Sequence, residues 1–204
     1  MTNTGSSRQT WARAAVVAVS SFFLGAATCF AQGVLPDTLR SFANSASGWT
    51  LVTVLLLAWL RVSPAVAALL GATSFVLLTL GYSAAAQIWD LFYNPTLFAL
   101  VGVVVGPFVG IATSWLRAAP AWRPALATAL LVGIGVGEAV YGLTVVADTT
   151  SPVYWVLIGA AALSLLVAML IRRIYGVWWK LLAVLGTGMT AGSFVVTYEL
   201  LGGV

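Results

Sequence analysis

Glu138 is the residue whose type and position most need a chemical explanation. It lies in the segment Gly133-Ile-Gly-Val-Gly-Glu-Ala-Val-Tyr-Gly142, and no other acidic or basic residue lies so deep in an apolar run. A charge at the centre of a bilayer costs at least about 2.5 to 3.5 kcal/mol. Helical spacing places Gly135, Tyr141 and Gly142 within one turn of the carboxyl group, on the same side. Because glycines leave room beside it, this group of residues is a candidate proton or ligand site.

Two interpretations of Glu138 are open from the sequence. Burial without a cation disfavours the ionised form, so the group is expected to be protonated or poised to exchange a proton, as in a proton relay or a cation-binding site. Alternatively, it is a neutral residue whose hydrogen bonds hold two helices together. No lysine or arginine lies within an apolar run to pair with it, so a structural salt bridge is not expected.

The remaining composition argues against an enzyme. The chain has no histidine and one cysteine, Cys29, so it lacks the commonest general base and metal ligand and forms no intrachain disulfide. One isolated carboxylate supplies neither a nucleophile with its base nor a metal site. We therefore expect no catalytic residue, no metal and no cofactor. The basic residues are scattered and form no stripe, so nucleic acid is not an expected partner.

The elements that position Glu138 are predicted to be membrane-spanning helices. Of 204 residues, 61% are hydrophobic and 7% are charged, whereas a soluble domain has about 25% charged residues. Lipid must therefore cover the surface, and the apolar runs have roughly the 17 to 25 residues that cross a bilayer. We predict an all-α bundle, with residues 1–11 as a short cytoplasmic tail and residues 12–204 as a single transmembrane domain. Its seven spans are residues 12–31, 44–60, 64–82, 95–116, 124–146, 153–171 and 178–201.

The positive charges predict the orientation of this bundle. Eight of the nine lysine and arginine residues fall in loops on one side of the predicted spans, and only Arg40 falls on the other side. Because cytoplasmic loops are enriched in lysine and arginine, the N-terminus is expected inside and the C-terminus outside. The expected location is the cytoplasmic membrane of a bacterium.

A glycine-rich stretch in the fourth predicted span indicates close helix packing. Gly102, Gly106 and Gly110 are spaced by four residues and make one groove, which a neighbouring backbone can approach. Pro107 lies among them and removes a backbone donor, so a kink is expected there. The stretch is interpreted either as ordinary tight packing or as a hinge that lines a cavity.

Polar and aromatic residues gather at the predicted outer ends of the spans. Asn44, Trp49 and Asn94 are the candidates for an outer mouth of a solute site. The alternative is that such residues form solvated loops and anchor the helices at the membrane interface.

Two resemblances to known families follow from short segments. Leu35-Pro36, Ser41-Phe-Ala-Asn44-Ser-Ala-Ser-Gly-Trp49 and Gly137-Glu138-Ala-Val-Tyr141 resemble an uncharacterised family of small multi-pass membrane proteins from high-GC bacteria, which implies no activity. The stretch from Asn94-Pro95-Thr96 to Val105-Gly-Pro-Phe-Val-Gly110 is similar to the glycine-proline helix of substrate-binding subunits of energy-coupling-factor vitamin transporters. Those subunits usually have six spans with both ends inside, unlike the seven predicted here.

The expected function is the binding or transport of a small solute or ion, with Glu138 at its centre. The alternative is a non-catalytic membrane subunit or scaffold that docks partner helices, in the manner of a vitamin-transporter substrate-binding subunit. The lipid bilayer is the partner common to both.

Overall fold

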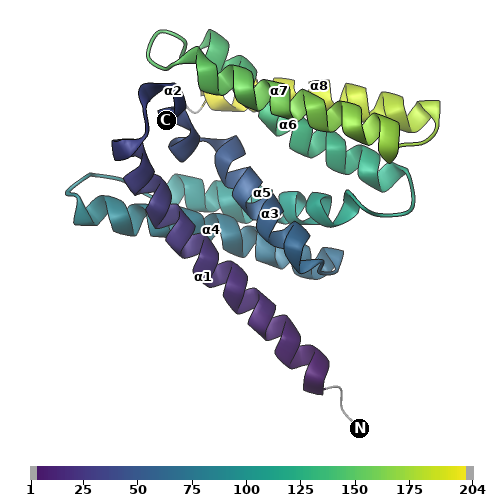
Figure 1. Ribbon diagram of the computed structural model, residues 1–204, viewed down its shortest axis with the longest axis horizontal. Helices are drawn as coiled ribbons and strands as arrows, with labels where there is room; N and C mark the ends of the chain where they lie inside the picture. Colours follow the sequence, from purple (N-terminus) through teal and green to yellow (C-terminus); the bar gives the residue numbers. More distant parts are fainter. Residues whose placement is uncertain (1–3, 201–204) are drawn as a thin grey trace. The chain divides into compact units, whose positions relative to one another are not determined.

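The computed structural model describes residues 4–200, and in that range it contains helices and their connections without strands (Figure 1). This confirms the predicted all-helical class. Helix α1 begins at Thr4, so most of the expected polar tail, residues 1–11, is helical. The elements are α1 (Thr4–Val34), α2 (Asp37–Arg40), the 3-10 turn η1 (Ser41–Asn44), α3 (Ala46–Leu60), α4 (Pro64–Ile88), α5 (Thr96–Trp115), α6 (Trp122–Thr144), α7 (Pro152–Arg172) and α8 (Val177–Leu200).

Six helices in the described range are long and apolar enough to cross a membrane: α1 from Trp11, α4, α5, α6, α7 and α8. The predicted second span, residues 44–60, differs from them. Helix α3 has 15 residues, which is about 22 Å at 1.5 Å per residue, whereas the hydrocarbon core is about 30 Å thick. The segment Asp37–Asn44 precedes it at an angle of 63°. The predicted second span is therefore not one continuous apolar helix, because a short helical segment bent away from α3 precedes it.

The chain divides into two compact units. The first unit contains the chain up to Ala31 and the segment Leu51–Ser114, and the second contains Gln32–Thr50 and the chain from Trp115 onward. The boundary falls within α3, whose first turn belongs to the second unit.

In the first unit, α5 packs closely along α4. A Cβ atom added at Gly110 would overlap the carbonyl group of Ala67, and one added at Gly106 would lie 2.7 Å from Cα of Ala72. The predicted glycine groove is thus filled by the backbone of α4, with Gly102 facing Phe75 toward the N-terminal end of α5. Helix α5 continues through Pro107 from Thr96 to Trp115, so these residues pack two helices together without breaking either.

Three buried hydroxyl groups connect α1, α3 and α4 within the first unit. The Oγ atom of Ser74 lies 2.9 Å from Oγ of Ser21 and 2.9 Å from Oγ1 of Thr53. All three side chains are fully buried. They satisfy one another, as polar groups in an apolar bundle must.

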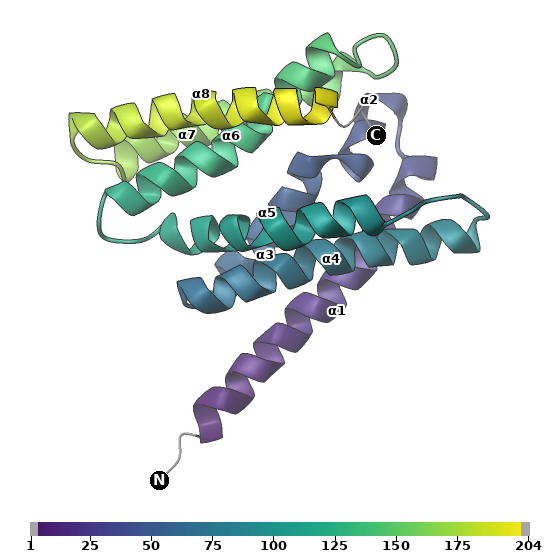
Figure 2. The ribbon, with the colours of Figure 1, turned by 180° about the vertical axis from the view of Figure 1, so that it is seen from behind.

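The second unit is built on α6, which packs against both α7 and α8 (Figures 1 and 2). Gly133 and Gly137 face α8 at Thr190 and Ala191, whereas Gly135 faces Ala162 of α7. Small residues on two sides of α6 therefore let both neighbours approach it closely, and α6 is the most buried of the long apolar helices.

Candidate solute site in the second unit

The first turn of α3 is held by hydrogen bonds from outside the helix. The first N–H groups of a helix have no partner within it and need one elsewhere. Ala46 and Ser47 donate their backbone N–H groups to Oε1 and Oε2 of Glu138, each over 2.7 Å. Gly48 donates to Oγ of Ser45 over 2.8 Å. The start of α3 is thus fully capped, by a serine at the N-cap position and by a carboxylate from α6.

The two oxygens of Glu138 both accept N–H groups, and such bonds favour the ionised carboxylate, whereas burial acts against it. The side chain is 3% exposed. The N-terminus of α3 carries a partial positive charge. It therefore takes the place of the lysine or arginine that is missing from the apolar runs. The partner of Glu138 is therefore the backbone of α3, which neither interpretation of the sequence named.

Ser45 connects this cap to α7. Its Oγ atom lies 2.6 Å from the hydroxyl oxygen of Tyr154, and its backbone is extended, with φ −124° and ψ 145°. That extended residue makes the bend between η1 and α3. The bend is consequently held by α6 through Glu138 and by α7 through Tyr154.

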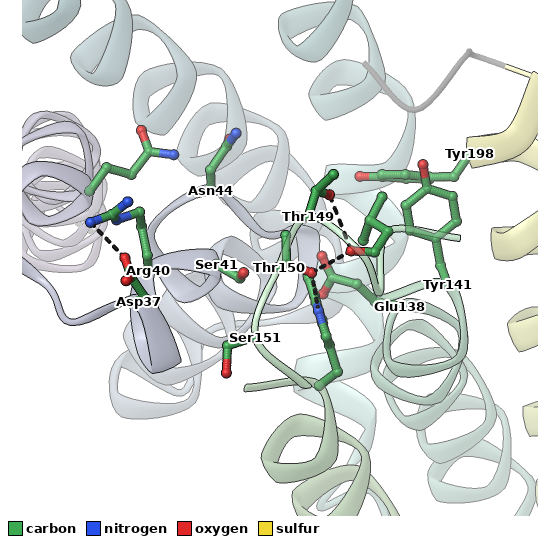
Figure 3. A pocket seen from close by; sticks show the side chains of 13 residues that line it. Asp37, Arg40, Ser41, Asn44, Glu138, Tyr141, Thr149, Thr150, Ser151 and Tyr198 are labelled. Carbon is green, nitrogen blue, oxygen red and sulfur yellow. Dashed lines mark hydrogen bonds and ion pairs between the residues drawn. The ribbon is translucent and has the colours of Figure 1, made fainter. Parts of the chain in front are cut away.

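A cavity of about 420 Å³ lies beside Glu138 (Figure 3). Its walls come from the segment Gln32–Asn44, from the loop between α6 and α7, and from aromatic side chains near the ends of α6, α7 and α8. Hydroxyl groups of Ser41, Thr149, Thr150 and Ser151 line it. The volume lies in the range that small-molecule sites occupy, and polar and apolar groups contribute about equally to the lining.

Asp37 and Arg40 form an ion pair at the rim, with 2.9 Å between Oδ1 and Nη2. Both side chains are exposed, at 83% and 55%, so solvent screens the pair. In Figure 3 this pair lies on the left of the view, away from the Glu138 carboxylate near the centre.

The residues predicted to surround Glu138 have different surroundings in the structure. Tyr141 lines the cavity together with Glu138. Gly142 lies against the indole ring of Trp155, and Gly135 lies against Ala162 of α7. The two glycines thus make room for helix α7, and the space beside the carboxylate comes from the cavity.

The three candidates for an outer mouth do not all belong to one unit. Asn44 lines the cavity. Trp49 belongs to the same unit but is buried at 7% exposure, so it is not a surface anchor. Asn94 belongs to the first unit, where its Oδ1 accepts the backbone N–H of Thr96 over 3.0 Å at the start of α5.

Several cavity residues were not singled out from the sequence. Thr149, Thr150 and Ser151 form a run of three hydroxyl residues in the α6–α7 loop, and this run was the available signal. Tyr198 gave no such signal, because it lies in an apolar helix. It reaches the cavity beside Tyr141, with 5.5 Å between the ring centroids.

The long apolar helices define the chain as a polytopic helical membrane protein. The short helix α3, whose first turn is capped by Glu138, is compatible with this class. Within the described part of the chain, histidine, cysteine, aspartate and glutamate side chains form no group of three that could hold a metal ion. A family model matches residues 4–203, and the chain belongs to that family, DUF6518, which is a family of unknown function. No curated protein and no solved structure matches the chain.

Proposed function

We propose that this protein is a non-catalytic membrane protein that binds a small polar solute, for uptake or for sensing, in the cavity beside Glu138. The observation that supports the proposal is the cavity of about 420 Å³, which three separate parts of the second unit line with polar and aromatic side chains. Glu138 and its cap on α3 form one wall, so a bound solute would contact the residue that holds the bend. Transport would then involve movement of this capped turn.

The proposed topology has seven crossings, with the N-terminus in the cytoplasm of a bacterium and the cavity facing outward. The number of crossings that precede a loop decides on which side of the membrane the loop lies. Arg8 and Arg13 precede the first span and favour an inside N-terminus. With the N-terminus inside, a non-crossing α3 would make every later loop change sides, and the basic residues of those loops would face outward, against the positive-inside rule. Those residues are Arg61, Arg117, Arg123, Arg172, Arg173 and Lys180.

A crossing α3 also explains why an acidic residue is buried in α6. A helix of about 22 Å begins inside the hydrocarbon region, where uncapped N–H groups cost several kcal/mol. Glu138 accepts two of those N–H groups. The same carboxylate would then serve the helix and the solute.

The test is a solute screen on the purified protein in lipid nanodiscs, read as a shift of the unfolding temperature. A ligand at about 100 times its Kd stabilises a protein by about 2.7 kcal/mol. Ser41→Trp should fill the cavity and remove the shift, because Ser41 lines it. Ser164→Trp is the control, because Ser164 is exposed on α7 and its hydroxyl bonds only within that helix. A shift that survives Ser41→Trp would place the solute elsewhere.

Uptake into proteoliposomes tests the role of Glu138 directly. Glu138→Gln should abolish pH-dependent uptake or binding of the solute while the protein is still expressed. Unchanged uptake would remove Glu138 from the mechanism.

A second function, docking of a partner helix, is supported by the open side of α8. No atom of the described chain lies within 4 Å of a Cβ built at Gly188 or Gly192, and this spacing is typical of helix pairs in membranes. Purification in mild detergent separates the two functions. A stoichiometric membrane protein partner would favour docking, and a stable lone bundle would favour the solute site.

A further inference from the structure

The charges that line the cavity do not cancel. Asp37 and Arg40 neutralise each other at 2.9 Å. Glu138 is the remaining acidic residue of the lining, and its two N–H donors favour the ionised form. Its hydrogen-bond donors are backbone N–H groups, which at a helix N-terminus amount to about half a positive charge. The described lining therefore retains a negative charge next to an uncharged, hydroxyl-rich wall.

Aromatic rings line the same cavity as this carboxylate. Tyr141 and Tyr198 pack edge to face, with 5.5 Å between their centroids, and both line the cavity. Trp155 lines it as well and donates its indole N–H to Oγ1 of Thr150 over 2.8 Å. Aromatic faces attract cations, most strongly where water is excluded. A carboxylate and aromatic faces in one cavity can together bind an ammonium group, through its charge and through cation–π contacts.

The size of the cavity favours a small organic molecule over a bare metal ion as the bound solute. A space of about 420 Å³ is far larger than a dehydrated metal ion, and small organic ligands occupy sites of about 300 to 1,000 Å³. An anion has little to bind it there, because the one cation of the lining, Arg40, is already paired with Asp37.

We propose that the solute is a small organic cation with one ammonium group, which Glu138 and the rings of Tyr141 and Tyr198 hold in the cavity. This inference rests on the proposed function, because it assigns the class of solute to the same site. The carboxylate oxygens have lone pairs beyond those used by Ala46 and Ser47, so an ammonium group can bind without displacing the cap of α3.

The test compares organic cations with neutral molecules of the same shape. Binding to the full chain in nanodiscs is measured by calorimetry for choline and 3,3-dimethylbutan-1-ol, for benzylamine and benzyl alcohol, and for ethanolamine and ethylene glycol, with benzoate as an anion. At least one cation should bind about tenfold or more tightly than its neutral partner. Glu138→Gln should remove that preference.

Two rim variants keep the test valid if Glu138→Gln fails to fold. Arg40→Gln leaves Asp37 unpaired and should tighten cation binding about two- to threefold at low salt, and Asp37→Asn should weaken it by a similar factor. Neither should change binding of the neutral partner. Both residues are exposed, so the fold does not depend on them.

The outcomes separate this inference from the proposed function. Equal binding of cations and neutral partners, or a preference for neutral molecules or benzoate, would overturn the cation while leaving a solute site. Absence of binding by every probe, whatever its charge, would overturn both. Opposite effects of the two rim variants on a cation, with none on its neutral partner, would support the proposal.

Discussion

Ser47 donates its backbone N–H to Oε2 of Glu138 over 2.7 Å, across 91 residues of sequence. The bond joins the first turn of α3 to the C-terminal half of α6, and Ala46 donates to the other oxygen of the same carboxylate. A short helix thus begins inside the bundle with its N–H groups satisfied. This one side chain holds the bend together with Tyr154 and also forms part of the cavity wall.

Glu138→Gln should destabilise the protein by about 1 to 3 kcal/mol. The amide keeps one acceptor oxygen for α3 but turns an NH₂ group toward the other N–H, so one charge-assisted bond is lost and one donor is left without a partner. Glu138→Ala should cost more, because both N–H groups lose their acceptor. Unfolding in mixed micelles, followed by tryptophan fluorescence, measures the difference.

The matched control for these variants is Glu199→Gln. Glu199 lies exposed on α8, so removal of its charge should leave the stability within about 0.5 kcal/mol of the native protein. If Glu138→Gln proved as stable as Glu199→Gln, the cap on α3 would not contribute to the fold.

The sequence predicted much of this fold because the bilayer imposes strong and simple constraints. Long apolar runs bounded by charges gave the six spanning helices, with ends that differ by a few residues from those observed. The cost of a charge in hydrocarbon identified Glu138 as the residue that needed a partner. These inferences use only composition and depth, which a sequence shows directly.

The partner of Glu138 could not be predicted in the same way. Its donors are backbone N–H groups of Ala46 and Ser47, which every residue other than proline possesses. No charged residue marks the bend at Ser45, so the sequence predicts residues 44–60 as one span. Only the packing of α6 and α7 against that turn shows where the helix begins.

The cavity was predictable in part. Asn44 was recognised by its depth, but Asn94 has a similar depth and belongs to the other unit. The sequence predicts how deep a residue lies along the membrane normal. Its position around the bundle depends on how the helices pack, which the sequence does not show. The division into two units likewise had no counterpart in the sequence.

Gly110→Ala should destabilise the first unit by about 1 to 3 kcal/mol, the usual cost of forcing atoms into a packed interior. The new methyl group would overlap the backbone carbonyl of Ala67 in α4, which cannot move without shifting the helix. Gly188→Ala is the control, because nothing lies within 4 Å of its added Cβ. Its stability should be unchanged or slightly higher. Equal effects of the two substitutions would contradict the observed packing of α5 on α4.

Ser74→Ala should cost about 1 to 2 kcal/mol. It removes the shared partner of Ser21 and Thr53, and hydrogen bonds between membrane helices contribute about 0.6 kcal/mol on average and up to about 1.7. Ser164→Ala serves as the control, because its hydroxyl bonds only to the carbonyl of Ala160 within α7. A double-mutant cycle of Ser74→Ala with Ser21→Ala should show coupling. Strict additivity would mean that the two hydroxyls act independently.

Tyr93→Phe should protect the protein at alkaline pH. Burial, reinforced by the neighbouring Tyr82, raises the pKa of Tyr93 above the ordinary tyrosine value, which is about 10. A raised pKa means that stability is complete below about pH 10 and is lost as the pH rises toward the folded-state value. The native protein should therefore lose about 1 kcal/mol more than Tyr93→Phe between pH 8 and pH 11. Parallel losses in unfolding experiments would show that Tyr93 does not contribute.

Site-directed labelling tests the proposed topology in whole cells. In a Cys29→Ala background, which removes the one native cysteine, a cysteine is placed at Asp148 in the α6–α7 loop or at Ala119 in the α5–α6 loop. Both positions are exposed. A membrane-impermeant maleimide should modify the Asp148→Cys variant in intact cells and the Ala119→Cys variant only after permeabilisation, because the arginines that flank Ala119 favour the cytoplasmic side. The reverse pattern would contradict the proposed topology. In that case the cavity would open toward the cytoplasm, and a solute supplied from outside would not reach it.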